Sequence, residues 1–284
     1  TGTRFSPAGQ AVVLALVQVG GLGLMTFAVF AGVVLGRKVA FTDRMVIQDS
    51  MHHTPKAGVR RLVRYVVGFT LAAEAAGALV LWLRFKDQFP AGSAAWHSVF
   101  HSVSAFCNAG FSLLPDSLVR YRGDWLVCLA VSGLVVLGGL GFLVNLELRD
   151  QVLARLRRTR PPVVTLHTRL VLLVTASLIA AGALGFLALE WDNVLRGLPA
   201  GERLLASWFA SVTPRTAGFN TVDYGRVSAD TLFFTIFLMF VGASPGSTGG
   251  GIKTTTFGLL CALVVARWRG RGRASVFHRT IPHA

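Results

Sequence analysis

Long runs of apolar residues without charge alternate with short basic segments along the chain. Four runs are long enough to cross a bilayer as helices, since about 20 helical residues span the hydrocarbon core. They are 8–36, 65–83 with the single charge Glu74, 125–146 and 170–189. A fifth run begins at Thr231, breaks in the glycine-rich stretch 242–251 and resumes over 257–266. These runs predict an all-α integral membrane protein.

Two further apolar segments, 93–106 and 203–213, are too short to span the membrane. A turn containing glycine follows each of them, so we expect half-helices that enter the membrane and return. The two segments end in strings that align with one gap, and their turn glycines, Gly110 and Gly218, stand 108 residues apart. The chain therefore predicts a repeated unit of helix, half-helix, glycine turn and helix, an organisation found in transport proteins.

Charge sets the orientation of these segments. Only 14% of the residues are charged, against about 25% in typical soluble domains. The net charge of +15 invites comparison with nucleic-acid-binding proteins, but 18 of the 28 Lys and Arg residues lie in three separate loops, 37–64, 149–169 and 267–279. A nucleic-acid site needs one continuous basic footprint. The positive-inside rule instead places these loops in the cytoplasm and predicts no nucleic-acid partner.

The glycine turns have the chemistry of a cation filter. A half-helix that stops inside the membrane directs the negative end of its dipole to the centre, and irregular backbone is tolerated there only where it lines a cavity or is buried in protein. Glycine lets the backbone turn its carbonyls toward an ion. An ordinary helix C-cap is the alternative, but its occurrence twice favours the filter. The predicted filter residues are Asn108, Ala109, Gly110, Phe111, Thr216, Ala217, Gly218 and Phe219.

Four strings carry a resemblance to a known family: 19–27 (VGGLGLMTF), 104–112 (SAFCNAGFS), 213–221 (TPRTAGFNT) and 246–256 (GSTGGGIKTTT). On these strings the chain resembles the Trk/Ktr/HKT superfamily of potassium transporters, and within it the bacterial KtrB-type membrane subunit. The resemblance implies potassium uptake across the cell membrane by a multi-pass protein. Four helix–pore-loop–helix repeats would surround a central ion pore, with K+ as the transported ion and Na+ open as a coupling or activating ion.

The resemblance also divides the chain and names its partners. It implies the end of repeat one at 1–36, repeat two at 62–148, repeat three at 166–266 and a linker toward repeat four at 267–284, with cytoplasmic loops at 37–61 and 149–165. We expect a fragment that lacks the first filter segment and the fourth repeat, and that does not conduct alone. The implied partners are the lipid bilayer, a second copy in a homodimer and a cytosolic nucleotide-binding RCK-type subunit (KtrA/TrkA-like). No cofactor is expected in this chain.

The basic loops 37–61 and 149–165 are the expected docking surface for that regulator, unless their charge serves only membrane orientation. The stretch 242–251 is predicted to be a gate below the filter, since Pro245 and the glycines cannot keep a helix intact and the broken backbone must face a cavity. A static kink is the alternative. The gate residues would be Gly242, Ser244, Pro245, Gly246, Gly249, Gly250, Gly251 and Lys253.

Two charged residues are expected to support the filter. Glu74, the carboxylate inside a span, would accept hydrogen bonds from a pore-loop backbone; it could equally be protonated or face a crevice. Arg215, beside the second turn, would repel potassium if it pointed into the ion path, so we expect it to pair with an acid behind the filter. Asp116 and Asp223 would either concentrate cations at the outer mouth or serve as turn residues.

Enzymatic alternatives fit the residues less well. An intramembrane hydrolase using Ser244 would need a histidine base at the same depth, yet the full spans lack histidine, and His97 and His101 lie on a half-helix. A phosphate-binding loop at 246–254 would need adjacent Gly and Lys, but Ile252 intervenes. The three cysteines show no metal or disulfide spacing, and His52-His53 is an ordinary pair in a cytoplasmic loop. We therefore predict a protein that is not an enzyme.

Overall fold

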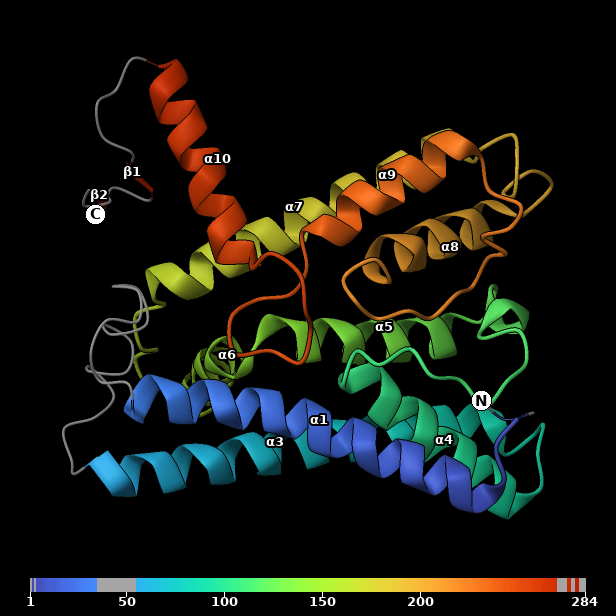
Figure 1. Cartoon of the computed structure of the whole chain (residues 1–284), viewed down its shortest axis with the longest axis horizontal. Helices are drawn as coiled ribbons and strands as arrows, with labels where there is room; N and C mark the ends of the chain where they lie inside the picture. Colours follow the sequence, from blue (N-terminus) through green and yellow to red (C-terminus); the bar gives the residue numbers. More distant parts are fainter. Residues whose placement is uncertain (1, 3, 35–54, 270–274, 277–278, 281–284) are drawn as a thin grey trace.

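The computed structural model describes residues 2, 4–34, 55–269, 275–276 and 279–280. The described chain is almost entirely helical, and its two termini lie on opposite sides of the molecule (Figure 1). In chain order the elements are α1 (Pro7–Val34), α3 (Pro55–Phe85), α4 (Ala91–Phe106), the 3-10 turn η1 (Val119–Tyr121), α5 (Trp125–Leu140), α6 (Phe142–Leu156), α7 (Leu166–Leu189), α8 (Ala200–Val212), α9 (Ala229–Phe240), α10 (Thr254–Trp268), β1 (Ser275–Val276) and β2 (Arg279–Thr280).

The predicted repeat is confirmed in the order of the helices. In one unit α4 packs against α3 and α5, and in the other α8 packs against α7, which also contacts α9. Both half-helices, α4 and α8, begin directly after a proline, Pro90 and Pro199. A proline costs nothing there, because the first N–H groups of a helix have no partner within the helix. The two units meet where α5 contacts α8 (Figure 1).

The uncharged run 125–146 is not one straight span, which corrects the prediction. Helix α5 ends at Leu140, and α6 leaves it at 109°. Gly141 sits at the bend with φ of 86°, and the N–H of Phe142 donates to the carbonyl of Gly246, 3.1 Å away. The bend makes room for the glycine-rich stretch between α9 and α10. Helix α6 then continues to Leu156, so the loop predicted at 149–165 begins as helix.

The break predicted after the fifth run is confirmed. Helix α9 ends at Phe240 and α10 begins at Thr254, three residues earlier than the apolar run suggested. The connecting chain turns inward between them and reaches α5 and α6 (Figure 1). The predicted loop 37–61 lies mostly outside the described residues, and so do His52-His53 and most of the linker 267–284.

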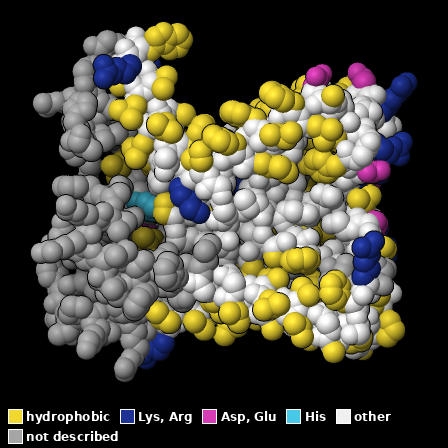
Figure 2. Space-filling view, viewed as in Figure 1, with side chains coloured by type: hydrophobic (Ala, Val, Ile, Leu, Met, Phe, Trp, Pro, Cys, Tyr) yellow, Lys and Arg dark blue, Asp and Glu magenta, His cyan; other side chains and the backbone are white. Residues whose placement is uncertain are grey.

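Apolar packing joins the two units and leaves apolar side chains outside. One buried cluster combines Phe106 of α4 and Val131 of α5 with Leu205 of α8. On the face seen in Figure 2, hydrophobic side chains cover the regions above and below a band of other atoms, and Asp and Glu appear together with Lys and Arg at the end where α7 finishes and α9 begins. Exposed residues such as Phe233 (77% exposed) are expected where lipid is the solvent.

Within the described residues, two helices have the length and apolar composition to cross a membrane, Leu62–Phe85 and Leu166–Leu189. The bent pair α5 and α6 would make a third if it is one broken span. Helix α1 is 28 residues long and uncharged over the same stretch that the sequence predicted. These helices support a multi-pass membrane protein.

Candidate ion-conduction site

The two glycine turns repeat one unusual backbone conformation. After α4, Asn108 and Gly110 have φ of 51° and 71°; after α8, Thr216 and Gly218 have φ of 67° and 76°. Left-handed φ is uncommon for residues other than glycine and costs about 1 kcal/mol or more. In each turn the left-handed residues are the glycine and the residue two positions before it. The two turns therefore share one backbone conformation, which an ordinary helix cap does not require.

Each half-helix braces its own turn through a hydroxyl that the sequence analysis did not single out. The Oγ of Ser104 donates to the carbonyl of Phe111 over 2.8 Å, and the Oγ1 of Thr213 donates to the carbonyl of Phe219 over 2.5 Å. Ser104 and Thr213 occupy matching places in the aligned strings, so the signal was present in the repeat. The carbonyl at the outer end of each turn is therefore fixed to its half-helix.

The other carbonyls of the turns remain available. Among the described residues, no hydrogen bond is directed at the six carbonyl oxygens preceding Phe111 and Phe219, those of Asn108, Ala109, Gly110, Thr216, Ala217 and Gly218. Asn108 and Ala217 are buried residues, and a buried carbonyl without a donor is costly. A dehydrated cation can replace the missing donors, as in filters built from backbone carbonyls. The six oxygens are thus suited to binding a cation.

The two turns touch at their glycines. A Cβ placed on Gly110 would lie 2.5 Å from the carbonyl oxygen of Ala217 and 2.8 Å from the Cα of Gly218. A Cβ on Gly218 would lie 3.3 Å from the Cα of Gly110. Residues 108 apart in the sequence are therefore in direct backbone contact. Gly110 is required both for its φ and for space, whereas Gly218 is required mainly for its φ.

The glycine-rich stretch 242–251, which we call the glycine loop, lies against the same turns. A Cβ on Gly249 would lie 2.6 Å from the Oγ1 of Thr216 and 3.2 Å from the Nδ2 of Asn108. The loop approaches from the side of the α5–α6 bend. It therefore contacts both turns at once, at the residues where each leaves its half-helix.

Backbone hydrogen bonds hold the glycine loop in this position. The N–H of Ser244 donates to the carbonyl of Gly139 (2.9 Å), and the N–H of Thr248 donates to that of Gly138 (3.2 Å). The Oγ1 of Thr248 also donates to the carbonyl of Phe106, the last residue of α4 (3.0 Å). Gly138 and Gly139, near the end of α5, thus form the surface on which the glycine loop docks. Its small residues let the two backbones approach each other.

The loop is also closed upon itself. The N–H of Gly242 donates to the carbonyl of Ile252 (3.1 Å) and that of Ala243 to the carbonyl of Gly250 (3.0 Å). Just after its C-terminal end the Nζ of Lys253 donates to the carbonyl of Gly249 over 2.8 Å. Because Gly249 is the residue that touches the turns, Lys253 is linked to them through a single carbonyl.

Glu74 and Arg215 both lie next to the turns, though not with the partners we expected. Glu74 is buried, and its carboxylate meets the thiol of Cys107 (Sγ to Oε1, 3.9 Å), the residue before Asn108, rather than a backbone N–H. Arg215 is buried beside Thr216, and among the described residues its guanidinium makes no ion pair and its Nη1 has no hydrogen-bond partner. The acid predicted behind the filter is not found there.

The remaining candidates have ordinary contacts. The Oγ of Ser244 lies 2.9 Å from the Oγ1 of Thr254. Asp116 forms an ion pair with Arg120 (3.1 Å). The Oδ1 of Asp223 accepts from the N–H of Gly225 two residues on (2.9 Å), which is the geometry of a turn residue. The described part of the chain brings together no three His, Cys, Asp or Glu side chains that could hold a metal ion.

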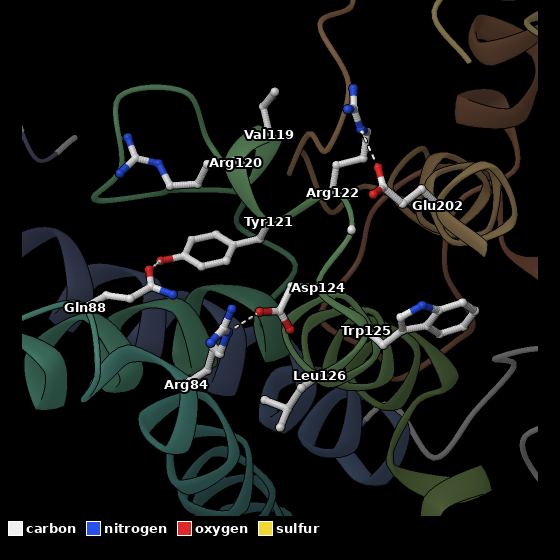
Figure 3. Close-up of a pocket in the computed structure, with 11 residues that line it drawn as sticks. Arg84, Gln88, Val119, Arg120, Tyr121, Arg122, Asp124, Trp125, Leu126 and Glu202 are labelled. Atoms are coloured by element: carbon white, nitrogen blue, oxygen red, sulfur yellow. Dashed lines mark hydrogen bonds and ion pairs between the residues drawn. The ribbon is translucent and has the colours of Figure 1, made fainter. Parts of the chain in front are cut away.

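A pocket of about 870 Å³ opens at the charged end of the molecule, between α3, η1, α5 and α8 (Figure 3). Two ion pairs lie in its lining: Arg84 pairs with Asp124, and Arg122 pairs with Glu202 (3.6 Å). None of the residues that line it belongs to a glycine turn or to the glycine loop. The pocket is therefore separate from the candidate filter.

Comparison with known proteins places this geometry in a family. A family model described as TrkH, cation transport protein, matches residues 2–282. The chain is 40% identical over 285 residues to the Ktr system potassium uptake protein B of Bacillus subtilis, covering 100% of this chain and 62% of that protein. It is 37% identical over 286 residues to the potassium/sodium uptake protein NtpJ of Enterococcus hirae, again covering 100% and 62%.

A solved structure has the same fold. The crystal structure of the potassium transporter TrkH from Vibrio parahaemolyticus matches 92% of this chain and 50% of its own, with a TM-score of 0.63 and 20% sequence identity. The chain therefore spans between half and about two thirds of the length of these relatives. The resemblance drawn from the glycine strings is confirmed, and the expectation that this is not an enzyme agrees with a family of ion transporters. The chain belongs to the TrkH family of cation transport proteins.

Proposed function

We propose that this chain forms part of the ion-conducting subunit of a potassium uptake system in the cell membrane. The observation that carries the proposal is the direct contact of Gly110 with Gly218, beside six carbonyl oxygens that receive no hydrogen bond from the described residues. The names of the relatives support potassium as the transported ion, and the name of NtpJ adds sodium.

In this proposal, Asn108–Phe111 and Thr216–Phe219 are two walls of the selectivity filter. Their carbonyls replace part of the water around a cation. A rigid backbone fixes the spacing of these carbonyls and so sets which ion loses its water at least cost. The remaining walls would come from the repeats expected beyond this chain. Glu74 and Arg215 would act from behind the turns: Glu74 through Cys107, and Arg215 through its neighbour Thr216.

The glycine loop, 242–251, would be the gate. Gly249 contacts both turns, and Lys253 binds its carbonyl, so a movement of the start of α10 would be passed to the inner end of the filter. The loop is held by hydrogen bonds to Gly138 and Gly139 more than by side chains. Such bonds can exchange with water when the loop moves into a hydrated pore, which keeps the cost of opening small.

The proposed assembly is a homodimer in the bilayer with a cytosolic RCK-type subunit. The relatives named as proteins of a Ktr system support a system of several components. The exposed arginines at the end of α6, Arg155, Arg157 and Arg158, are candidates to bind that subunit. The division into repeats at 1–36, 62–148 and 166–266 follows the helix order described above and remains part of the proposal.

Flux through the full-length protein in liposomes tests the proposed function. Purified protein should take up K+ or its tracer Rb+ down an imposed gradient without any chemical turnover, and should prefer it to Na+. Protein-free liposomes and liposomes with a heat-unfolded sample are the controls. Equal, unselective leak of both cations, in protein that is folded by its melting curve, would contradict the proposal.

A further inference from the structure

We infer that a strap of hydrogen bonds and close polar contacts, running from His101 through Ser112 and Ser117 to Asn220, fixes the spacing of the two glycine turns and so acts on ion selectivity. The inference rests on the proposed function and adds four positioning residues to it. None of them binds the ion. They connect the outer ends of the turns, whereas Gly110 and Gly218 touch directly.

The strap begins on the half-helix α4. His101 is fully buried, and its Nδ1 lies 2.7 Å from the carbonyl of His97. A carbonyl can only accept, so Nδ1 carries the hydrogen and Nε2 faces the Oγ of Ser112, 2.9 Å away. Ser112 directly follows Phe111, the last residue of the first turn. The imidazole thus fixes the direction in which the backbone leaves that turn.

Ser112 lies next to Ser117, the next residue of the strap. Because Nε2 can only accept, the single hydroxyl hydrogen of Ser112 is donated to it. The Oγ of Ser112 accepts from the N–H of Leu114 over 3.0 Å, and the carbonyl oxygen of Ser117 packs 3.4 Å from the same Oγ. The segment from Ser112 to Ser117 is thereby folded into a compact bend. Ser117 itself has φ of 57°. A serine held in the left-handed region is strained, and such strain persists only where surrounding contacts enforce it.

Asn220, the residue after the second turn, holds Ser117 in this left-handed conformation. Its Oγ accepts from the N–H of Asn220 over 3.0 Å, and the N–H of the next residue, Leu118, donates to the carbonyl of Asn220 over 2.9 Å. Asn220 directly follows Phe219, the last residue of the second turn. Of the two residues that follow the turns, Asn220 is therefore hydrogen-bonded to Ser117 and Ser112 packs against its carbonyl. The strap crosses between the two repeats.

The imidazole of His101 also packs against α3 and the second turn. Its ring centroid lies 6.3 Å from that of Phe219 and 5.9 Å from that of Phe85, which meets it edge-on. His101 thus binds the first turn by a hydrogen bond and packs on the second by its ring face. Carbonyl positions within a filter depend on such supports, because an error of a fraction of an ångström changes which ion fits.

Matched variants of the full-length protein separate the strap from general packing. His101→Phe keeps a ring and removes both nitrogens. His101→Gln restores a polar group toward Ser112. His97→Phe is the control, because it keeps a ring stacked on that of His101 (6.1 Å between centroids) and removes only the nitrogens, of which Nδ1 lies 2.9 Å from the carbonyl of Ser93 rather than near a turn. Ser117→Gly removes the hydroxyl but suits the left-handed backbone, so it tests the strap without new strain.

The measurement is the ratio of K+ to Na+ uptake in liposomes, with the melting temperature of each variant beside it. His101→Phe and Ser117→Gly should lower the ratio about tenfold, which corresponds to about 1.4 kcal/mol, the scale of one buried hydrogen bond. His101→Gln should recover most of the ratio, and His97→Phe should leave it unchanged. The His101→Phe and Ser117→Gly effects should combine less than additively, since both break one strap.

The outcomes distinguish the strap from the function on which it rests. Wild-type protein that takes up neither cation selectively overturns the proposed function and the strap together. Selective wild-type protein with unchanged ratios in folded His101→Phe and Ser117→Gly variants overturns the strap alone. A ratio that stays constant while the melting temperature falls equally in the His101 and His97 variants also overturns it, because that pattern marks packing only. Should His101→Phe fail to fold, Ser117→Gly decides the matter.

Discussion

The carboxylate of Glu190 binds Ser228 twice, through the backbone N–H (2.9 Å) and the hydroxyl (2.8 Å) of that residue. Glu190 follows the last residue of α7, and Ser228 is the N-cap of α9. The other oxygen of the carboxylate accepts from the side-chain amide of Asn193 (2.7 Å). One fully buried acid therefore ties the C-terminal end of α7 to the N-terminal end of α9.

The first prediction concerns pH and follows from this tie. Burial alone would raise the pKa of Glu190, but hydrogen bonds from Thr231 and Ser228 outweigh it and hold the pKa below its ordinary value of 4.5. A lowered folded pKa means that the stabilisation is present above about pH 4.5 and is lost as pH falls through the lower, folded value. We expect the melting temperature of the purified protein to fall on acidification in that range.

Glu190→Gln should remove part of this acid sensitivity and lower the free energy of unfolding by about 1–3 kcal/mol at neutral pH, since charged hydrogen-bond partners are lost. Asp192→Asn is the matched control: it removes an exposed carboxylate two residues on. An acid transition as steep in Glu190→Gln as in the wild type, followed by circular dichroism, would show that another group carries the effect.

The second prediction concerns the turn glycines. Gly110→Ser should lower the K+ over Na+ uptake ratio by roughly tenfold or more, because its Cβ would meet the carbonyl of Ala217 at 2.5 Å and its φ is 71°. Gly218→Ser should have the smaller effect, since its nearest neighbour lies at 3.3 Å. Gly133→Ser on α5 is the control, because a Cβ there meets nothing within 4 Å.

The order of these effects is itself a test. Unchanged ratios in both turn variants, in protein that inserts and folds, would remove the filter assignment. A larger effect at Gly218 than at Gly110 would instead keep the filter but contradict the geometry of contact between the turns.

Much of this architecture could be predicted because it follows from local patterns in the sequence. Charge-free runs marked the long helices, and the repeated strings ending at Gly110 and Gly218 marked the half-helices and turns. The bend at Gly141 could not be predicted in the same way. The run 125–146 is uncharged throughout, and hydropathy does not record that residues 244–248 dock onto its end.

The supports of the turns were missed for a related reason. Ser112 and Ser117 lie in a loop with no periodicity, and their partners, His101 and Asn220, are distant in the chain. For Arg215 we predicted a partner that the structure does not show. We expected an acid to pair with its buried guanidinium, but in the described part of the chain it forms no ion pair.

The third prediction concerns the basic end of α6. Replacing Arg155, Arg157 and Arg158 by Gln should weaken binding of the RCK-type subunit roughly three- to a hundredfold, since each exposed ion pair contributes up to about 1 kcal/mol. These side chains are exposed, so insertion and folding should not change. Binding is measured by co-purification and by titration at two salt concentrations. A complex that survives at raised salt would leave these arginines as orientation signals alone.

A control for charge itself is available on the opposite face. Arg196→Gln with Arg226→Gln removes two exposed arginines near the outer end of α7 and should leave binding of the subunit intact. Equal weakening by both sets of substitutions would point to a general loss of protein quality, and the α6 surface would lose its claim to specificity.

The last prediction concerns the glycine loop as a gate. Deleting Gly249, Gly250 and Gly251 removes the residue that touches Asn108 and Thr216, together with the carbonyl that Lys253 binds. If the loop blocks the inner end of the filter, K+ flux should rise and depend less on the regulatory subunit. A static kink that only makes room for its neighbours would give no such gain, because removing it would disturb packing and lower the flux.

A milder variant protects this test against misfolding. Thr248→Val removes the hydrogen bond from Oγ1 to the carbonyl of Phe106 while keeping the shape of the side chain. Freed from α4, the loop should open more often and raise the unregulated flux severalfold, the change expected for about 1 kcal/mol of lost hydrogen bonding. Thr256→Val on the exposed side of α10 is the matched control. Flux that stays low and fully regulated in the folded deletion and in Thr248→Val would exclude the loop as the gate and leave the static kink.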